Sequence, residues 1–459
     1  MLPEAFKERI QKQQYINAEE LLRALDKPSD TTIRINRNKW HKNPLNSEVV
    51  PWCKDGFYLE ERPSFTLDPL FHAGCYYSQE ASGMFLEQVF KQLIDKGHNI
   101  KVLDLCGAPG GKSTHLSSLI GQRGLLVANE VIRQRASVLA ENLTKWGLSN
   151  TIVTQSDPSA FGRMPDFFDL ILVDAPCSGE GMFCDGTAVK EWSVANTELC
   201  SERQKRILMD IWPALKENGI LIYSTCTFNP CENEKNIKWF TGKHLAESLR
   251  LDISDYEGIT EIDYQGIYGY GFYPGRIRGE GLFISVLKKT EKQKRSDFRY
   301  KSGKERRITR EEKAIAEKWT LFPADNLIKI GDNIISAAGS ADDYFELSER
   351  IKLIKSGTII CTIKKKNYIP SHELAMSVNF RKHSFPEVNL DTDQALAYLA
   401  REHIKPEIVQ NGWNIVCYKG VSLGFVNNIG SRINNYYPVE WHIRMSITGT
   451  AREDLIEWK

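Results

Sequence analysis

Short apolar segments alternate with amphipathic ones over residues 98–290. The apolar segments lie at 101–105, 124–130, 151–157, 168–174, 219–227 and 281–289. Most are separated by stretches with hydrophobic residues three and four apart, a spacing that predicts helices. Repeated strand–helix units of this kind predict an α/β fold, a doubly wound parallel sheet with helices on both faces. Ligands of such sheets gather at the carboxyl ends of the strands.

The chain on either side of this region has different patterns. The N-terminal part combines two amphipathic helical pieces with a basic strand, in which Arg34, Arg37 and Lys39 are candidates for phosphate contacts. The C-terminal part combines strands, glycine turns and aromatic residues interleaved with Lys and Arg, typical of a small RNA-binding β-barrel. We therefore expect an N-terminal RNA-facing α+β module (1–75), an α/β core (76–290), a basic linker (291–314), an α+β intermediate domain (315–400) and a C-terminal β-barrel domain (401–459).

Composition limits the partners and the compartment. The chain has 459 residues, 41% of them hydrophobic and 26% charged, with a formal net charge of +1, so nucleic-acid binding has to come from local basic patches. Its ten cysteines have no paired metal spacing. We see no signal peptide and no apolar run of about 18 residues, the length that spans a membrane. We expect a reduced cytoplasmic protein, a monomer without membrane contact.

The segment CGAPGGKS (106–113) joins an apolar strand to a helix and predicts an anion- or nucleotide-binding turn, because free N–H groups and the helix dipole point at the ligand. Its glycines, at 107, 110 and 111, do not fit the dinucleotide fingerprint G-x-G-x-x-G. A phosphate loop needs four residues between its glycines and this turn has three, although Asp174 resembles a magnesium-binding aspartate. The third candidate is S-adenosylmethionine, with Glu130 at the end of the next strand as the acceptor for the ribose hydroxyls.

Two cysteines follow neighbouring predicted strands. Cys177 lies in DAPCSGEGM (174–182) and Cys226 in STCTFNPCENE (224–234). A lone strand cysteine is usually a small buried hydrophobe. A pyrimidine C5 methyltransferase, however, needs a thiolate that adds to carbon 6 of the base, because carbon 5 is otherwise a poor nucleophile. Asp174 is placed to neutralise the charge that builds on the ring near N3.

These motifs, together with YYSQEAS (76–82), resemble the Sun/Nop-type RNA (cytosine-5) methyltransferases over about residues 75–290. IPSHELAM (369–376) and GWNIVCYKGVSLG (412–424) are similar to the RsmF-type 16S rRNA branch, which carries a PUA-like end domain. The resemblance implies a Rossmann-like class I core. It also implies methyl transfer from S-adenosylmethionine, without a metal, to carbon 5 of a cytidine in 16S rRNA or the small ribosomal subunit.

The resemblance also implies residue roles. Cys226 is the expected nucleophile, Cys177 assists release of the product, and Lys112 supports the site electrostatically. The chemistry of the two thiols alone does not rank them. Asp157 is expected near the adenine. The expected S-adenosylmethionine pocket consists of Cys106, Gly107, Ala108, Pro109, Gly110, Gly111, Lys112, Glu130, Asp157 and Asp174.

Two positions depart from the family pattern: Gly107 replaces an alanine, and Pro274 is followed by Gly275 where many relatives have a histidine. We interpret the remaining notable side chains, Cys106 included, as structural: Cys184, Cys200, Cys231, His115 and His372. Two other functions stay open, an NTPase that uses residues 107–113 with Asp174 and a non-catalytic RNA-binding assembly factor. In the tail, RNA contacts are expected from Lys419, Arg432, Arg444 and the aromatic residues at 413, 418, 436, 437 and 441.

Overall fold

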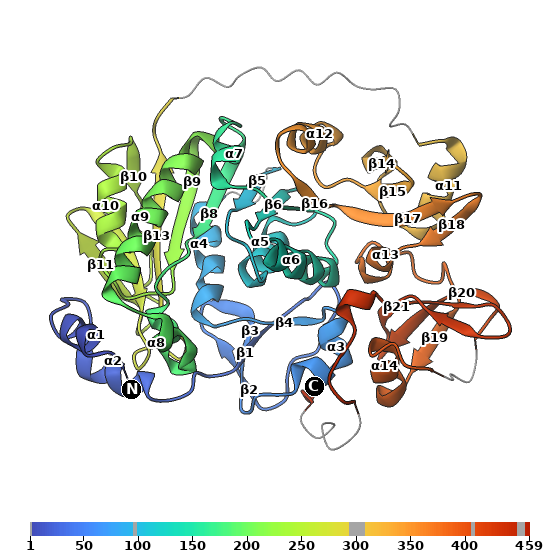
Figure 1. Cartoon of the computed structure of the whole chain (residues 1–459), viewed down its shortest axis with the longest axis horizontal. Coiled ribbons are helices and arrows are strands. Elements are labelled where there is room, and N and C mark those ends of the chain that lie inside the picture. The colour runs from blue at the N-terminus through green and yellow to red at the C-terminus, as the bar shows by residue number, and fades with distance from the viewer. Residues whose placement is uncertain (1, 95–98, 293–307, 405–408, 448–454) are drawn as a thin grey trace.

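The computed structural model describes residues 2–94, 99–292, 308–404, 409–447 and 455–459, which form four β-sheets with helices around them (Figure 1). Most of the expected basic linker, 293–307, lies outside the described residues. The last residues of the expected linker lie in the first turn of helix α11 (Arg310–Trp319). Thr309 and Glu312 cap this turn, each side chain accepting a hydrogen bond from the backbone N–H of the other residue.

The central sheet has ten strands in the order β11-β12-β13-β9-β8-β5-β6-β7-β16, with β10 paired to β13. Strands β5 to β9 are parallel, as the repeated strand–helix pattern predicts, whereas β11 to β13 are antiparallel, so the sheet is mixed. The strands are β5 (Lys101–Asp104), β6 (Leu125–Asn129), β7 (Thr151–Thr154), β8 (Phe168–Asp174), β9 (Leu215–Thr225), β10 (Ala246–Ser248), β11 (Thr260–Tyr264), β12 (Ile267–Phe272), β13 (Leu282–Lys289) and β16 (Leu353–Ser356).

Successive strand residues point to opposite faces of this sheet and enter two separate hydrophobic cores. In β5, Val102 packs in one core and Leu103 in the other. The first core receives side chains from α4 (Leu86–Leu93), α5 (Gly111–Ile120) and α6 (Arg133–Trp146). The second receives them from α7 (Pro158–Gly162), α9 (Val194–Ile211) and α10 (Glu234–Thr241). Helices cover both faces, which confirms the predicted doubly wound α/β core.

The N-terminal module contains helices α1 (Glu4–Ile10) and α2 (Ala18–Leu25) and a sheet in the order β2-β3-β1-β4. Its strands are β1 (Thr32–Ile35), β2 (Ser47–Val50), β3 (Cys53–Leu59) and β4 (Tyr76–Ser78), and α3 (Pro69–His72) precedes β4. Because β4 pairs with β1, this sheet extends beyond residue 75, where the sequence-based boundary was set.

The intermediate region forms a third sheet in the order β14-β15-β17-β18, with α11, α12 (Ala341–Arg350) and α13 (His372–Met376). Its strands are β14 (Leu327–Ile330), β15 (Asn333–Ser336), β17 (Thr358–Lys364) and β18 (Asn367–Pro370). Strand β16 leaves this region and pairs with β7, so it covers the open edge of the central sheet. The sequence does not predict this pairing, because the two strands are far apart along the chain.

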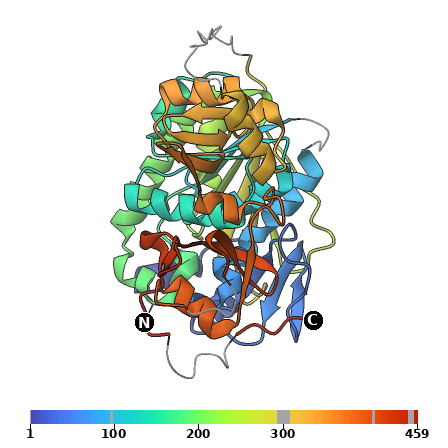
Figure 2. The same cartoon turned by 90° about the vertical axis from the view of Figure 1, so that its right-hand side faces the viewer.

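The C-terminal sheet has the order β19-β20-β21-β22, with α14 (Thr392–Leu399) beside it. Its strands are β19 (Glu387–Leu390), β20 (Gly412–Tyr418), β21 (Val421–Asn428) and β22 (Ile433–Asn435). Because β19 pairs in parallel with β20, this sheet begins before residue 401, where the sequence-based boundary was set. The C-terminal sheet lies next to the N-terminal one (Figure 2), and side chains from both, such as Ile33 and Tyr437, share one hydrophobic core.

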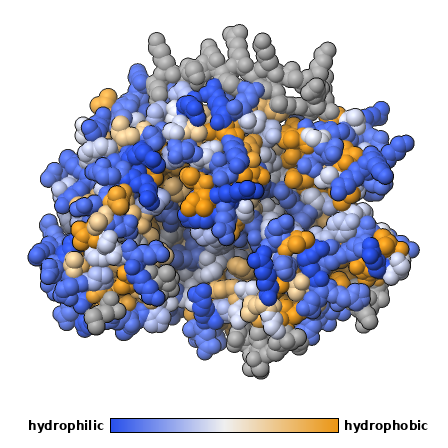
Figure 3. All heavy atoms as spheres, in the orientation of Figure 1, coloured by the Kyte–Doolittle hydropathy of each residue, from blue (hydrophilic) through white to orange (hydrophobic). Residues whose placement is uncertain are grey.

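The surface in the view of Figure 3 is mostly hydrophilic, with hydrophobic side chains in scattered small groups. Across the described ranges, no helix combines the length and the apolar character needed to cross a membrane.

Candidate active site

The glycine turn (residues 106–111) connects β5 to α5 at the carboxyl end of the sheet. Gly110 has a φ of 124°, a conformation that side-chain-bearing residues rarely adopt. A Cβ at Gly107 would lie 2.6 Å from Ser113 Oγ, the atom that donates a 2.6 Å hydrogen bond to Asp104. The absence of a side chain at Gly107 therefore leaves room for the Ser113–Asp104 contact.

The glycine turn lines a pocket of about 200 Å³. Tyr77–Glu80 of the YYSQEAS segment, the following Gly83, Lys112 and Asp174 also line it. The structure thus brings most of the expected pocket residues together. Gly110, Glu130 and Asp157 are not among those that line this space.

Asp104 lines the same pocket and was not among the residues selected from the sequence. Its side chain is fully buried, and its Oδ1 has no hydrogen-bond partner in the structure. Burial raises the pKa of Asp104 to about 7, although the Ser113 hydroxyl opposes the rise. Its sequence signal was a lone acidic residue within an otherwise apolar strand.

Glu130 and Asp157 follow β6 and β7 along the same edge of the sheet. The Glu130 carboxylate accepts a hydrogen bond from Ile132 N–H at 2.9 Å and pairs with Arg135 at 3.3 Å. Arg135 also donates to the Ala108 carbonyl, which ties Glu130 to the glycine turn. Asp157 caps α7, and two hydrogen bonds from Ser159 hold the pKa of its carboxyl below the ordinary value.

Lys112 and Asp174 form an ion pair, with Lys112 Nζ 2.8 Å from Asp174 Oδ2. The other carboxylate oxygen accepts a 2.6 Å hydrogen bond from Ser224 Oγ, at the end of β9. Burial would lower the pKa of Lys112, but Asp174 outweighs it and raises the pKa above its ordinary value. Lys112 therefore carries its charge at neutral pH.

The two cysteines meet at the ends of adjacent strands β8 and β9. Cys177 Sγ lies 3.1 Å from Cys226 Sγ, and Cys226 N–H points at Cys177 Sγ at 3.3 Å. The hydrogen bond with Cys226, reinforced by burial, raises the pKa of Cys177 well above the ordinary value for a thiol. Cys177 is therefore a protonated thiol at neutral pH, able to share its proton with the neighbouring sulfur.

The sequence-based prediction of phosphate contacts in the N-terminal module is wrong for Arg34. Its guanidinium is buried, stacks 4.4 Å from the Trp146 ring centroid and donates to Gln79 and Thr114, so it supports the start of α5. Arg37 pairs with Asp55 at 2.8 Å. Lys39 donates to two backbone carbonyls, and burial lowers its pKa to about 8.

The tail also differs from expectation. Tyr418 and Tyr437 are buried in the core that the two terminal sheets share, so their rings are not available to stack on bases. Tyr436 is exposed and lies 4.4 Å from the partly exposed ring of Trp413. The three expected cations are exposed: Lys419, Arg432 and Arg444.

Two further positions discussed from the sequence, His115 and Gly275, have close neighbours in the structure. His115, expected without ligand partners, has Cys53 and Glu87 close by, their potential ligand atoms all within 4.8 Å of one another. Glu87 also pairs with the exposed Lys91 at 2.7 Å, and burial lowers the pKa of His115 to about 4, so its imidazole is neutral at pH 7. At Gly275, the second departure from the expected family pattern, φ is 98° and a Cβ would lie 2.9 Å from Glu20 Cγ of α2.

Family models match three parts of the chain. The model of the 16S rRNA methyltransferase RsmB/F matches residues 91–288. The N-terminal domain of 16S rRNA methyltransferase RsmF matches residues 2–81, and the methyltransferase RsmF PUA domain matches residues 385–443. The three matches fall on the N-terminal, central and C-terminal sheets, and the sheet of the intermediate region (β14, β15, β17 and β18) lies between the second and third.

Similar proteins extend over nearly the whole chain. The ribosomal RNA small subunit methyltransferase F of Aliivibrio fischeri (strain ATCC 700601 / ES114) is 30% identical over 96% of this chain and 97% of its own length. The protein of the same name from Shewanella loihica is 30% identical over 92% of this chain and 91% of its own.

Solved structures match somewhat less than two thirds of the chain. A methyltransferase homologue from Pyrococcus horikoshii is 30% identical, with a TM-score of 0.53 over 62% of this chain and 95% of that one. NSun6 from Pyrococcus horikoshii, solved with SFG, is 19% identical, with a TM-score of 0.52 over 63% of this chain and 99% of that one, and supports the fold alone. With its N-terminal, catalytic and PUA parts all matched in order, the chain belongs to the RsmF family of 16S rRNA methyltransferases.

Proposed function

We propose that this chain transfers a methyl group from S-adenosylmethionine to carbon 5 of a cytidine in 16S rRNA, through a covalent adduct on Cys226. The observation that carries the proposal is the pair of thiols 3.1 Å apart, at the strand ends that also bear Asp174. An NTPase or a non-catalytic RNA-binding protein has no use for this pair.

The pocket beside the glycine turn fits the methyl donor. The unpartnered Asp104 Oδ1 is an acceptor for an ammonium group, and the start of α5 favours a carboxylate. We infer that the donor is held by Asp104, Cys106–Lys112, Glu130, Asp157 and Asp174. When bound, S-adenosylmethionine supplies an electrophilic methyl group.

The residues around the base have complementary roles. The Cys226 thiolate adds to carbon 6 and makes carbon 5 nucleophilic. Asp174, held by Lys112 and Ser224, carries a proton to N3 as the thiolate adds, neutralises the negative charge on the ring, and takes the proton back when the adduct breaks down. After methylation a base takes the carbon 5 proton and the carbon–sulfur bond breaks with its electron pair going to Cys226. The Cys177 thiol donates its proton to the departing Cys226 sulfur and regains one from solvent.

The RNA substrate is supported by the C-terminal domain. Lys419, Arg432 and Arg444 are exposed there, and Tyr436 and Trp413 offer ring faces. Phosphate contacts from such cations supply affinity, and stacking on aromatic rings holds unpaired bases. The names of the full-length relatives point to rRNA of the small subunit.

The test is methyl transfer from isotopically labelled S-adenosylmethionine to 16S rRNA, followed by mass spectrometry of the nucleosides. We expect labelled 5-methylcytidine. Cys231→Ala is the matched control, because Cys231 is an exposed thiol in the same loop as Cys226. Label in another nucleoside, or none with both free 16S rRNA and small subunits, would contradict the proposal.

A further inference from the structure

Two glutamates lie fully buried behind the loops that carry the thiols. Glu180 lies in the loop that follows Cys177, and Glu232 lies in the loop that follows Cys226. Buried carboxylates destabilise a protein unless hydrogen bonds or a counter-charge compensate them, so their partners indicate what they are for.

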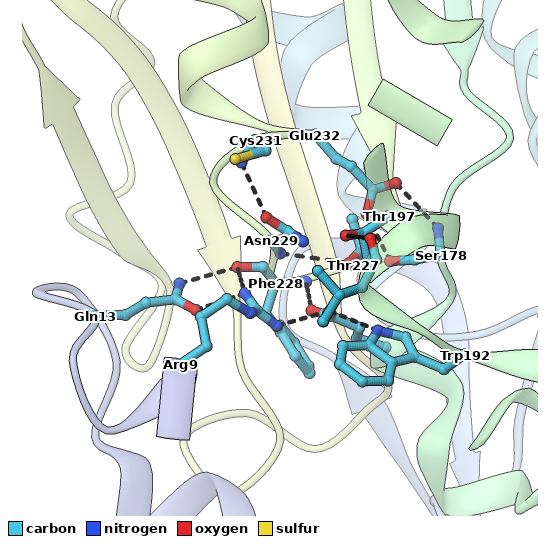
Figure 4. A network of polar contacts seen from close by, with 12 residues as sticks. Arg9, Gln13, Ser178, Trp192, Thr197, Thr227, Phe228, Asn229, Cys231 and Glu232 are labelled. Atoms are coloured by element: carbon cyan, nitrogen blue, oxygen red, sulfur yellow. Dashed lines mark hydrogen bonds and ion pairs between the residues drawn. The ribbon is translucent and has the colours of Figure 1, made fainter. Parts of the chain in front are cut away.

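Glu232 holds the loop of the other cysteine. Its carboxylate accepts hydrogen bonds from Ser178 N–H at 3.0 Å and from the Ser178 hydroxyl at 2.5 Å (Figure 4). Gln204 Nε2 donates a third at 2.9 Å. The Ser178 hydroxyl also lies 2.9 Å from Thr227 Oγ1. Ser178 directly follows Cys177 and Thr227 directly follows Cys226, so Glu232 fixes the backbone beside one thiol to the loop of the other.

Glu180 makes the reciprocal contact. It accepts a hydrogen bond from Phe228 N–H at 3.1 Å, in the loop of Cys226. Trp192 Nε1 donates to it at 2.9 Å, and Arg9 forms an ion pair with it at 2.6 Å. Each cysteine loop therefore contributes one buried carboxylate that holds a backbone N–H of the opposite loop.

The N-terminal module completes this arrangement. Arg9 lies on α1, and Gln13 follows the end of that helix. Gln13 Nε2 donates to the Phe228 carbonyl at 2.9 Å, and Arg9 Nη1 does so at 3.3 Å (Figure 4). Arg9 and Gln13 thus bind the Phe228 carbonyl directly. Arg9 also pairs with Glu180, which accepts the hydrogen bond from Phe228 N–H.

We propose that Glu180 and Glu232 are positioning residues that fix the separation of Cys177 and Cys226, and that Arg9 of the N-terminal module is the counter-charge this requires. The proposal rests on the proposed function, because the separation matters only if both thiols act on one base. Irregular loops cannot satisfy their backbone N–H groups within a helix or strand, so they need such acceptors. Displacing a reacting group by about 1 Å costs on the order of 100-fold in rate.

The experiment compares Glu180→Gln, Glu232→Gln and Arg9→Met in single-turnover methylation of 16S rRNA at saturating S-adenosylmethionine. We expect rates about 10- to 100-fold below wild type. The KM for RNA and the calorimetric affinity for S-adenosylmethionine should stay unchanged, and Arg9→Lys should restore most of the rate. The assays are run at pH 8, because burial raises the pKa of Glu232 to about 7.

Lys7→Met is the matched control, since Lys7 lies on the same helix and pairs with Glu4 at 3.3 Å. It should methylate like wild type. Wild-type rates in folded Arg9→Met and Glu180→Gln, or a loss that appears only in cofactor affinity, would overturn the proposal. Should Glu232→Gln fail to fold, Arg9→Met still decides, because its guanidinium is partly exposed.

Amide hydrogen exchange separates this proposal from the proposed function. Exchange at Phe228 N–H should accelerate in Arg9→Met and Glu180→Gln but not in Lys7→Met, whatever reaction the site performs. If wild type forms no 5-methylcytidine while these exchange rates change as expected, the proposed function fails and the loop contacts stand. If exchange does not change, the positioning role is refuted even when wild type is active.

Discussion

At the scale of single residues, the proposed chemistry assigns different roles to two neighbouring cysteines. Cys177 is held as a thiol by its hydrogen bond with Cys226 and by burial. Cys226 Sγ lies 3.7 Å from the sulfur of the exposed Met182. Both sulfurs are partly buried, so exposure does not rank them; the protonated Cys177 can act as an acid, which leaves Cys226 as the proposed nucleophile.

This difference predicts opposite phenotypes. Cys226→Ala should abolish methylation, because no thiolate is left to add to carbon 6. Cys177→Ala should still attack and methylate, then stall as a covalent protein–RNA complex that survives denaturing electrophoresis. The double mutant should resemble Cys226→Ala. If the trapped complex forms in Cys226→Ala instead, the roles of the two cysteines are the reverse of those proposed.

Asp104 predicts a pH dependence of cofactor binding. Its folded-state pKa of about 7 is raised above the unfolded value of 3.8, so its contribution to stability is present at low pH and is lost as pH rises through 7. A ligand ammonium group binds the ionised form. Calorimetry should therefore give an S-adenosylmethionine affinity about tenfold higher at pH 8 than at pH 6. In Asp104→Asn the affinity for S-adenosylmethionine should be low and should not change between pH 6 and pH 8. If this variant keeps the pH dependence, a group other than Asp104 causes it.

At the scale of elements, β16 shows how a local bend permits a distant pairing. Gly357 follows β16, has a φ of 66°, and donates its N–H to the Thr151 carbonyl of β7. A Cβ there would lie 1.9 Å from the Ser336 carbonyl oxygen. The chain can leave the central sheet and enter β17 at this point only without a side chain.

Gly357→Ala should therefore lower the free energy of unfolding by more than the strain of a positive φ alone. Gly331→Ala is the control, because Gly331 has a φ of 56° and nothing within 4 Å of its added Cβ. Strain alone costs about 1–2 kcal/mol, and Gly357→Ala should exceed it clearly in chemical denaturation. Equal losses in the two variants would show that the Ser336 contact relaxes freely.

At the scale of the whole molecule, the termini are joined. The C-terminal residues 455–459 hydrogen-bond back to residues 43–45 of the N-terminal module, and Trp458 packs against Trp40 at 5.5 Å. Deleting the tail would therefore remove part of the N-terminal core as well as any RNA surface. Point substitutions are the cleaner probe of RNA binding.

Replacing Lys419, Arg432 and Arg444 together by glutamine should weaken binding of 16S rRNA while leaving the melting temperature unchanged, because all three are exposed. If each contacts one phosphate of unpaired RNA, the slope of log K against log salt should fall by about 2. The control variant replaces Lys216, Lys238 and Lys243 by glutamine as well; these lysines lie outside the C-terminal domain, so the slope should stay as in wild type. An unchanged slope would remove the tail from the RNA-binding surface.

The sequence by itself determined the α/β core and the family. The spacing of hydrophobic residues and the turn glycines reflect local backbone structure, so they can be recognised without knowing which distant segments are in contact. It also identified the ends of β8 and β9 as the place of the thiols, since parallel strands bring their carboxyl ends to one edge. The roles of Cys226, Cys177 and Lys112 remain predictions.

Only the tertiary structure decided which charged residues face inward. Arg34 was expected at the surface, yet it is buried against Trp146, and Asp104 is a buried carboxyl with an unpartnered oxygen. The pairing of β16 with β7 and the contact of Arg9 with Glu180 join segments more than a hundred residues apart. Such contacts depend on how separate elements pack, and no local pattern of hydrophobic and polar positions encodes that packing.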